Sequence, residues 1–193
     1  MPGGSISGLL DKYGAFNEKV TLNYTQQIAL AVDYLHTNRF LHRDLKGANC
    51  FVDSTGRSIR IGDFGTAAKL HASITPAGQF RGELLGTVAF MAPEVLRGED
   101  YGRHCDIWSI GCCMLEMFEG KPPWNARDLT NHLALIYKIA SASVSPPIPD
   151  NVSPPTKDLI QRCLESNPSD RATASELLTH AVFTRLPHLY LES

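Results

Sequence analysis

A small group of polar residues in this sequence could together transfer a phosphoryl group. Asp44, Lys46 and Asn49 lie in the segment HRDLKGANC, residues 42–50, and Asp63 begins the tripeptide DFG. Phosphoryl transfer depends mainly on positioning and charge neutralisation, which suits two carboxylates, a carboxamide and a fixed cation. In this interpretation Asp44 accepts the proton of a substrate hydroxyl, and Lys46 offsets charge on the transferred group. Asp63 would hold one Mg²⁺ ion at the phosphates, and Asn49 would hold a second ion through its neutral side-chain oxygen.

The surrounding sequence predicts elements that would position these side chains. Residues 21–36 carry apolar side chains at intervals that fit one face of a helix, which would end in front of segment 42–50. The apolar segments 49–53 and 58–63 flank the turn residues 54–57, a pattern typical of two strands joined by a turn. Asp63 therefore comes at the end of this strand pair. The apolar positions of the helix are Tyr24, Ile28, Ala31, Val32 and Leu35.

The rest of the chain is predicted to be mostly helical, apart from one long loop. Residues 5–12 are expected to form a short helix. Residues 104–120 are apolar nearly all round, which is typical of a helix at the centre of a domain, and Gly120 with the following prolines would end it. Residues 65–86 are rich in small and polar residues and are expected to form a mobile loop. Further helices are expected at about 128–140, 155–165 and 173–180.

Composition indicates one soluble domain with a substantial core. The chain has 193 residues, of which 43% are hydrophobic and 20% are charged. Its formal net charge of -2 provides no basic field, so nucleic acid and membrane surfaces are not expected as partners. No segment approaches the about 18 uninterrupted apolar residues of a membrane span, and the N-terminus does not resemble a signal peptide. The five cysteines include no CxxC pair, which favours buried, reduced thiols in a cytoplasmic protein.

A third motif makes the pattern specific. The tripeptide APE, residues 92–94, follows HRDLKGAN and DFG in the order that is the signature of protein kinases. The lysine two residues after Asp44 resembles serine/threonine kinases, since tyrosine kinases have an alanine-type residue there. Residues 86–112 and 121–142 resemble the MAP kinase kinase kinases, in the MEK kinase, type one-like branch. The resemblance implies an α+β fold: a protein-kinase-like large (C-terminal) lobe, mainly α-helical with a short β-hairpin at the catalytic loop, with the small lobe absent.

The same resemblance assigns structural roles to three residues outside the catalytic loop. Glu94 would pair with Arg171 near the end of the domain, because a buried carboxylate and a buried guanidinium need each other. Asp106 is similar to the aspartate at the start of the central helix that braces the catalytic loop.

Regulatory roles follow in the same way. Arg43 matches the arginine that pairs with a phosphorylated activation loop in related kinases. Thr75, Ser73 and Thr87 are the candidate phosphorylated residues, and Thr87 also matches the threonine that bridges base and lysine, so its two roles compete. Thr75 could equally be a solvated loop residue. His42 is expected to pack the loop, because Asp44 already fills the role of base.

The beginning of the chain resembles the hinge of a kinase, with ATP and Mg²⁺ as the implied cofactors. Met1 and Ser5 fall within hinge residues 1–5, where the nucleotide base hydrogen-bonds to the backbone, and Phe51 matches the apolar residue under adenine. Lys46, Asn49 and Asp63 would complete the site. Residues 1–187 would form the C-terminal lobe of the kinase domain, followed by a tail at 188–193.

Two motifs of a whole protein kinase do not occur in the sequence. Neither the Gly-rich GxGxxG pattern nor the strand lysine of VAIK is present, and in the family both precede the catalytic loop. We therefore expect the chain by itself to bind ATP weakly, since the nucleotide is clamped between two lobes. The apolar surface that faces the small lobe would be exposed.

Three functional hypotheses remain at this point. The preferred one is a serine/threonine kinase that phosphorylates MAP kinase kinases, because every residue of the catalytic set is present. The alternative is a non-catalytic docking or regulatory module, or a decoy, that uses the helices near 131–141 and competes with a full-length kinase. A pseudokinase scaffold is the least favoured, since it predicts the loss of a motif aspartate.

Overall fold

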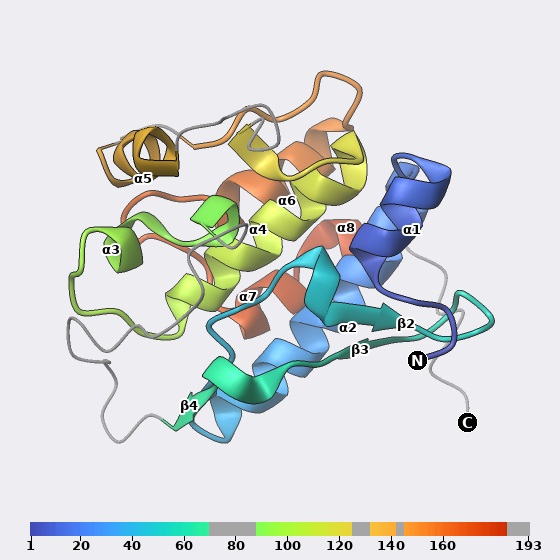
Figure 1. Cartoon of the computed structure of the whole chain (residues 1–193), viewed down its shortest axis with the longest axis horizontal. Helices are drawn as coiled ribbons and strands as arrows, with labels where there is room; N and C mark the ends of the chain where they lie inside the picture. Colours follow the sequence, from blue (N-terminus) through green and yellow to red (C-terminus); the bar gives the residue numbers. More distant parts are fainter. Residues whose placement is uncertain (70–87, 125–131, 142–144, 185–193) are drawn as a thin grey trace.

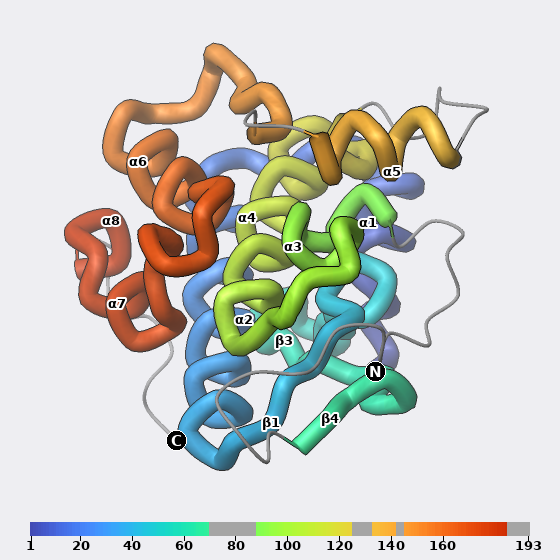
Figure 2. The backbone as a smooth tube through the Cα atoms, turned by 90° about the vertical axis from the view of Figure 1, so that its left-hand side faces the viewer, coloured from blue at the N-terminus to red at the C-terminus, as the bar shows by residue number. Residues whose placement is uncertain are grey.

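Helix α4 (His104–Glu119) runs through the middle of the molecule, with α2 (Glu18–Thr37) packed alongside it (Figure 1). Figure 2 shows α6 (Pro154–Cys163), α7 (Ala174–Leu178) and α8 (Ala181–Thr184) on one side of α4, with α3 (Pro93–Leu96) and α5 (His132–Ala140) on the other. The computed structural model describes residues 1–69, 88–124, 132–141 and 145–184. The α+β fold expected of a kinase large lobe is confirmed.

Helix α4 has the all-round burial that its composition predicts. Every residue from Cys105 to Phe118 is buried, so no face of the helix is left for solvent along this stretch. The helix ends at Gly120, whose φ of 71° is the left-handed conformation that glycine adopts without steric cost. Its amide donates to the carbonyl of Glu116 at 2.8 Å. The predicted central helix is therefore confirmed.

Helix α2 begins earlier than its apolar periodicity predicts. Asn17 precedes the helix, and its side chain accepts a hydrogen bond from the amide of Val20 at 3.0 Å. This cap starts the helix at Glu18, although the apolar pattern on which the prediction rests begins several residues later. The buried face, which includes Ile28 and Val32, packs against α4 and α7.

The remaining predicted helices are present with shifted bounds. Helix α1 (Ile6–Tyr13) starts after the cap residue Ser5, and α6 starts at Pro154. The first part of the helix expected at 128–140 lies outside the described residues, which resume at α5. The helix expected at about 173–180 is present as α7, which ends slightly earlier because Thr179 caps it, and the sequence did not predict the short helix α8 that follows.

Two short antiparallel strand pairs lie beside the helices. Strands β2 (Cys50–Val52) and β3 (Ile59–Ile61) pair with Cys50 opposite Ile61, which confirms the predicted hairpin in a shorter form. Strand β1 (Phe40–Leu41) pairs with β4 (Ala68–Lys69), and the sequence does not signal this pair because two residues are too few for an alternating pattern.

The prediction that residues 65–86 form one long loop is therefore wrong at its beginning. The 3₁₀ helix η2 (Phe64–Thr66) and then β4 occupy its first residues. The rest of the expected loop, from residue 70 onward, lies outside the described residues. Among the described parts of the chain, no helix has the length and hydropathy needed to cross a bilayer.

The cysteines are buried free thiols, as the sequence predicts. All five are free and buried, on or beside the helices that form the core. Burial raises the pKa of Cys163 to about 12, and burial likewise raises the pKa values of Cys105 and Cys112 well above those of exposed thiols. Since the thiolate is the reactive form, these cysteines are protected from modification in two ways: reagents cannot reach the buried thiols, and the raised pKa keeps the thiols protonated.

Alkylation is therefore expected to require unfolding. At about pH 8, iodoacetamide should modify Cys163 in the folded chain at least about 100-fold more slowly than in the urea-unfolded chain. Mass spectrometry of the two samples over time measures the ratio. Equal labelling rates in the two samples would contradict the buried, protonated thiol.

Candidate active site

The carboxylate of Asp44 lies at the centre of the polar residues that the sequence analysis singled out. Its Oδ2 is 2.9 Å from Nζ of Lys46 and accepts a hydrogen bond from Nδ2 of Asn49, also at 2.9 Å. Its Oδ1 is buried and has no hydrogen-bond partner in the part of the chain that is described. The structure therefore brings Asp44, Lys46 and Asn49 together, and among the described residues Oδ1 of Asp44 has no hydrogen-bond partner.

The turn that places Asn49 beside Asp44 is the 3₁₀ helix η1 (Gly47–Asn49). The amide of Asn49 donates to the carbonyl of Lys46 at 2.9 Å, and its side-chain Nδ2 also donates to the backbone carbonyl of Asp44 at 2.8 Å. Asn49 is only 6% exposed, so its side chain is held by the loop rather than by solvent. Because both donors of this amide group face Asp44, its oxygen is directed to the other side.

Asp63 reaches the same region through the hairpin. The amide of Gly62 donates to the carbonyl of Asn49 at 2.9 Å, which brings the residue before Asp63 against the end of the catalytic loop. Asp63 itself has φ 58° and ψ 71°, a left-handed conformation that a non-glycine residue adopts at an energetic cost. Its Oδ1 accepts from the amide of Gly65 at 3.3 Å, and the residue is exposed.

The oxygen atoms of Asn49 and Asp63 suit Mg²⁺. This ion prefers carboxylate and carbonyl-type oxygens, keeps several waters and uses few protein ligands beside the phosphates of its nucleotide. One carboxamide and one exposed carboxylate, joined through the hydrogen bond of Gly62, match that preference. The residues present therefore fit the ion.

The buried carboxylate of Asp106, at the start of α4, holds the first half of the catalytic loop. Its Oδ2 accepts from the amide of His42 at 3.0 Å, and its Oδ1 accepts from the amide of Arg43 at 2.8 Å. Nε2 of His36 lies 2.8 Å from Oδ2. Arg43 has φ 68°, so these bonds stabilise a backbone conformation that is otherwise unfavourable.

The pKa of Asp106 is lowered although burial alone would raise it. Burial is the largest single influence, but the hydrogen bond and charge of His36 together with the amides of Arg43 and His42 outweigh it. A carboxyl whose pKa is lower in the folded chain stabilises the fold above its unfolded pKa. That contribution is lost as the pH falls through the folded value.

Substitution of Asp106 with asparagine is therefore expected to destabilise the chain in a pH-dependent way. At pH near 7 the free energy of unfolding should fall by about 2 kcal/mol, because the amide replaces a charged acceptor of several hydrogen bonds. Below pH of about 4 the difference from the wild-type chain should shrink. Urea unfolding of both chains at several pH values measures this difference in the free energy of unfolding. A difference that stays constant down to the acid end would exclude the charge of Asp106 as its source.

His42 is buried and hydrogen-bonded to backbone at both ring nitrogens. Its Nε2 donates to the carbonyl of Gly62 at 3.0 Å, and its Nδ1 accepts from the amide of Asp44 at 3.3 Å. It is 0% exposed. These contacts favour the packing role expected for this residue, because neither nitrogen is directed to a substrate.

Arg43 contacts the segment after DFG. Its Nε donates to the carbonyl of Thr66 at 2.6 Å, and its Nη1 donates to the hydroxyl of Tyr101 at 3.3 Å. The candidate phosphorylated residues Thr75 and Thr87, as well as Ser73, lie outside the described residues. The regulatory role of Arg43 therefore stays a prediction.

The first residues of the chain pair with β2. The amide of Gly3 donates to the carbonyl of Val52 at 3.1 Å, and the amide of Val52 donates to the carbonyl of Gly4 at 2.8 Å. Ser5 forms a bridge with Phe51, and its side chain caps α1. Met1 is 42% exposed. The expected hinge residues therefore lie along the strand that carries the expected adenine-contacting residue.

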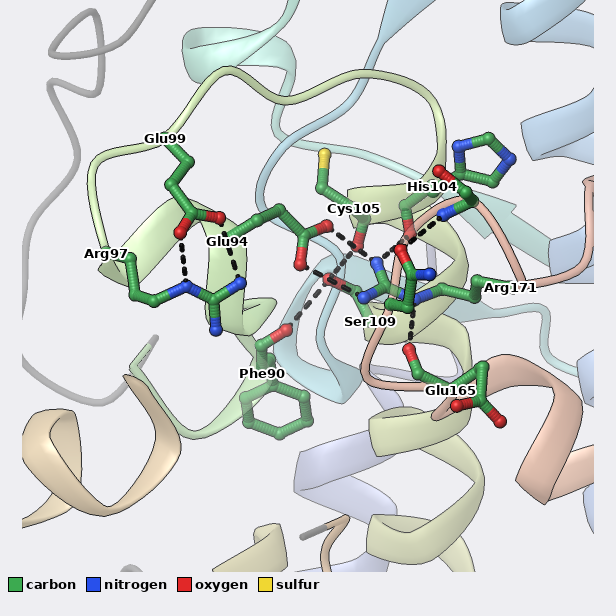
Figure 3. Close-up of polar contacts among 11 residues, drawn as sticks. Phe90, Glu94, Arg97, Glu99, His104, Cys105, Ser109, Glu165 and Arg171 are labelled. Atoms are coloured by element: carbon green, nitrogen blue, oxygen red, sulfur yellow. Dashed lines mark hydrogen bonds and ion pairs between the residues drawn. The ribbon is translucent and has the colours of Figure 1, made fainter. Parts of the chain in front are cut away.

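Glu94, on α3, and Arg171, between α6 and α7, form a buried pair (Figure 3). Arg171 donates two hydrogen bonds to the carboxylate of Glu94, from Nη1 to Oε1 at 2.7 Å and from Nη2 to Oε2 at 3.0 Å. Arg171 also donates to the carbonyls of His104, at 2.7 Å, and Glu165, at 2.8 Å. Because the side chains are 2% and 0% exposed, the pair is in place to fix α3 to the start of α4.

Two residues of this arrangement were missed by sequence reasoning. His36 contacts Asp106, and Glu116 accepts hydrogen bonds from the catalytic loop and from α1. Glu116 does carry a signal, because it is a charged residue in a helix that is otherwise apolar nearly all round. His36 carries none, since a histidine near the end of a helix is usual.

Comparison with known proteins agrees with the geometry. Residues 1–183 match the family model described as protein kinase domain. The chain is 58% identical over 183 residues to mitogen-activated protein kinase kinase kinase 1 of Mus musculus, covering 95% of this chain and 12% of that protein. It is 44% identical over 184 residues to mitogen-activated protein kinase kinase kinase 3 of Arabidopsis thaliana, covering 95% and 28%. It is 42% identical over 180 residues to mitogen-activated protein kinase kinase kinase 3 of Homo sapiens, covering 93% and 28%. The chain spans only a small part of the length of these relatives.

Proposed function

Because this chain belongs to the protein kinase family, in its MAP kinase kinase kinase branch, we propose that residues 42–65 take part in phosphoryl transfer from ATP to a serine or threonine. In this proposal Asp44 is the general base and Lys46 offsets charge on the transferred group. Asn49 and Asp63 hold Mg²⁺.

The observation that carries the proposal is the state of the Asp44 carboxylate. Lys46 and Asn49 both contact its Oδ2, whereas its buried Oδ1 has no partner among the described residues. A buried polar atom without a partner is costly, and such atoms gather where a ligand completes the site. An oxygen in this state is suited to accept the proton of a substrate hydroxyl as that hydroxyl attacks phosphorus.

The remaining residues would position the reactants. Lys46, whose Nζ is 2.9 Å from Oδ2 of Asp44, would offset charge on the phosphoryl group during its transfer. Bound by Asn49 and Asp63, Mg²⁺ would supply neutralisation of the phosphate charge. Phe51, beside residues 1–5, would support the adenine ring.

The family implies a protein substrate and the use of ATP. We propose MAP kinase kinases as the substrates, serine or threonine as the acceptors and the cytoplasm as the location, because the relatives are mitogen-activated protein kinase kinase kinases. Neither nucleic acid nor a membrane is included as a partner.

A docking or regulatory module is the second candidate, and α5 favours it. Leu133 and Tyr137 lie one helical turn apart and are 74% and 76% exposed, although both are large and apolar. A decoy that uses this helix would bind a partner of the full-length kinase and would not need ATP.

One experiment separates the two candidates. We would compare this 193-residue chain with the same chain joined behind the N-terminal lobe of the mouse relative, and measure ATP·Mg²⁺ binding by calorimetry. Phosphate transfer to an inactivated MAP kinase kinase would be followed in parallel, with the mouse lobe alone as the control. We expect weak or no binding by the short chain, and binding with transfer by the fused chain. A fused chain that binds ATP but transfers nothing would exclude the catalytic proposal and leave the docking function.

A further inference from the structure

Glu116 is a buried carboxylate that connects three elements of the fold. It lies on α4, is 3% exposed, and accepts a hydrogen bond from the amide of Gly47 at 2.9 Å through Oε2. Through Oε1 it accepts from the hydroxyl of Ser7, on α1, at 2.7 Å. A buried charge is retained at a cost unless hydrogen bonds compensate it, and here the donors come from the catalytic loop and from α1.

Gly47 brings the loop backbone unusually close to this carboxylate. A Cβ atom at position 47 would lie 2.3 Å from Oε2 of Glu116 and 2.8 Å from Oγ of Ser7. A side chain at position 47 would force the carboxylate of Glu116 or the hydroxyl of Ser7 to move, so glycine lets the amide of residue 47 reach Glu116 without displacing either. Gly47 is also the first residue of η1, the turn between Lys46 and Asn49.

The catalytic loop is therefore attached to α4 at two separate points. Asp106 accepts hydrogen bonds from the amides of His42 and Arg43, which precede Asp44. Glu116 accepts a hydrogen bond from the amide of Gly47, which follows Lys46. Given the rise of an α-helix, the two carboxylates start from backbone positions about 15 Å apart. Asp44 and Lys46 lie between the two attachments.

We propose that Glu116 is a positioning residue, which holds η1 so that Lys46 and Asn49 stay in contact with Asp44. Ser7 extends this function, because it ties the same carboxylate to the first helix after the expected hinge. The catalytic part of this inference rests on the proposed phosphoryl transfer. Its structural part, the restraint of η1, stands on the contacts alone.

Hydrogen exchange on the 193-residue chain tests the structural part without any activity. Glu116→Ala should speed amide exchange in the peptide that covers residues 45–49 by about tenfold, since the buried amide of Gly47 loses its acceptor. Glu116→Gln should stay within about threefold of wild type, because its carbonyl oxygen can still accept. Glu119→Ala, at the end of the same helix, is the matched control and should leave this peptide unchanged.

Two results would overturn the structural part. Unchanged exchange at residues 45–49 in Glu116→Ala would show that Glu116 does not restrain η1. An equal increase across every peptide of α2 and α4 would show a general loss of stability instead of a local restraint. A local increase, rescued by Glu116→Gln, supports the proposal.

Kinetics of the fused chain test the catalytic part. Glu116→Ala should lower kcat by about tenfold and change KM for ATP by a smaller factor, because the turn positions Lys46 and Asn49 around Asp44, whereas the expected adenine contacts at residues 1–5 and Phe51 lie outside it. Glu116→Gln should recover most of kcat. A change in KM alone would exclude the positioning role. If the wild-type fused chain is inactive, the proposed function fails, while the exchange experiment still decides whether Glu116 restrains η1.

Discussion

Substitution of Asp44 with asparagine should lower kcat of the fused chain by about 1,000-fold, because an amide cannot take up the proton of the substrate hydroxyl. Asparagine has nearly the same shape, and its oxygen can still accept from Lys46 or Asn49, so the loop should keep its conformation. The measurement is phosphate incorporation into an inactivated MAP kinase kinase under saturating ATP. Circular dichroism and the unfolding midpoint should match those of the wild-type chain.

The exposed Asp150 provides the control for this substitution. It precedes α6, and Asp150→Asn makes the same chemical change without touching the catalytic loop. We expect its kcat to lie within about twofold of wild type, as for surface substitutions in general. Transfer by Asp44→Asn at the rate of this control would rule out Asp44 as the base.

Substitution of Arg171 with methionine should have the largest effect on stability. It leaves the carboxylate of Glu94 buried without its partner and removes the donor from two backbone carbonyls. Breaking a buried ion pair from one side costs about 3 to 5 kcal/mol, and we expect a loss of that size in the free energy of unfolding measured in urea. The double variant Glu94→Leu/Arg171→Met should recover part of the loss, because no unpaired charge remains.

Arg97 and Glu99 give a matched comparison on the surface, and Figure 3 shows them close to the buried pair. Their side chains are 33% and 52% exposed, with a contact of 2.7 Å between Nε and Oε1. Because exposed pairs contribute little, Glu99→Gln should change the free energy of unfolding by less than about 1 kcal/mol. Equal losses for Arg171→Met and Glu99→Gln would contradict the view that burial makes the Glu94–Arg171 pair important.

Features whose signal lies in neighbouring residues could be predicted from the sequence alone. The catalytic set could be proposed because Asp44, Lys46 and Asn49 lie in one short segment, and α4 could be predicted because its apolar residues leave no polar face. Both signals belong to neighbouring residues. The boundary of α2 was less accurate because its cap, Asn17, precedes the periodic residues.

Contacts between distant residues could not be found in this way. The Glu94–Arg171 pair was expected only from the family resemblance, because nothing in either local sequence indicates the other partner. The pairing of β1 with β4 and the contact of Glu116 with Gly47 each join segments that are far apart in the sequence. The sequence shows that Glu116 is a charged residue in an apolar helix, but only the packed structure shows that it accepts a hydrogen bond from the amide of Gly47.

The distance in sequence between Glu94 and Arg171 also determines when this pair can form during synthesis of the chain on the ribosome. The two residues are 77 positions apart, and α7, which packs on α2, comes later still. At typical rates of synthesis, Glu94 would wait about 4 to 15 s for its partner. During that interval α3 has no buried counter-charge to hold it on α4, and α2 has not yet met α7. Ribosome-bound chains that stop before residue 171 should therefore remain protease-sensitive at α3, and full resistance should appear only when the last helices have emerged.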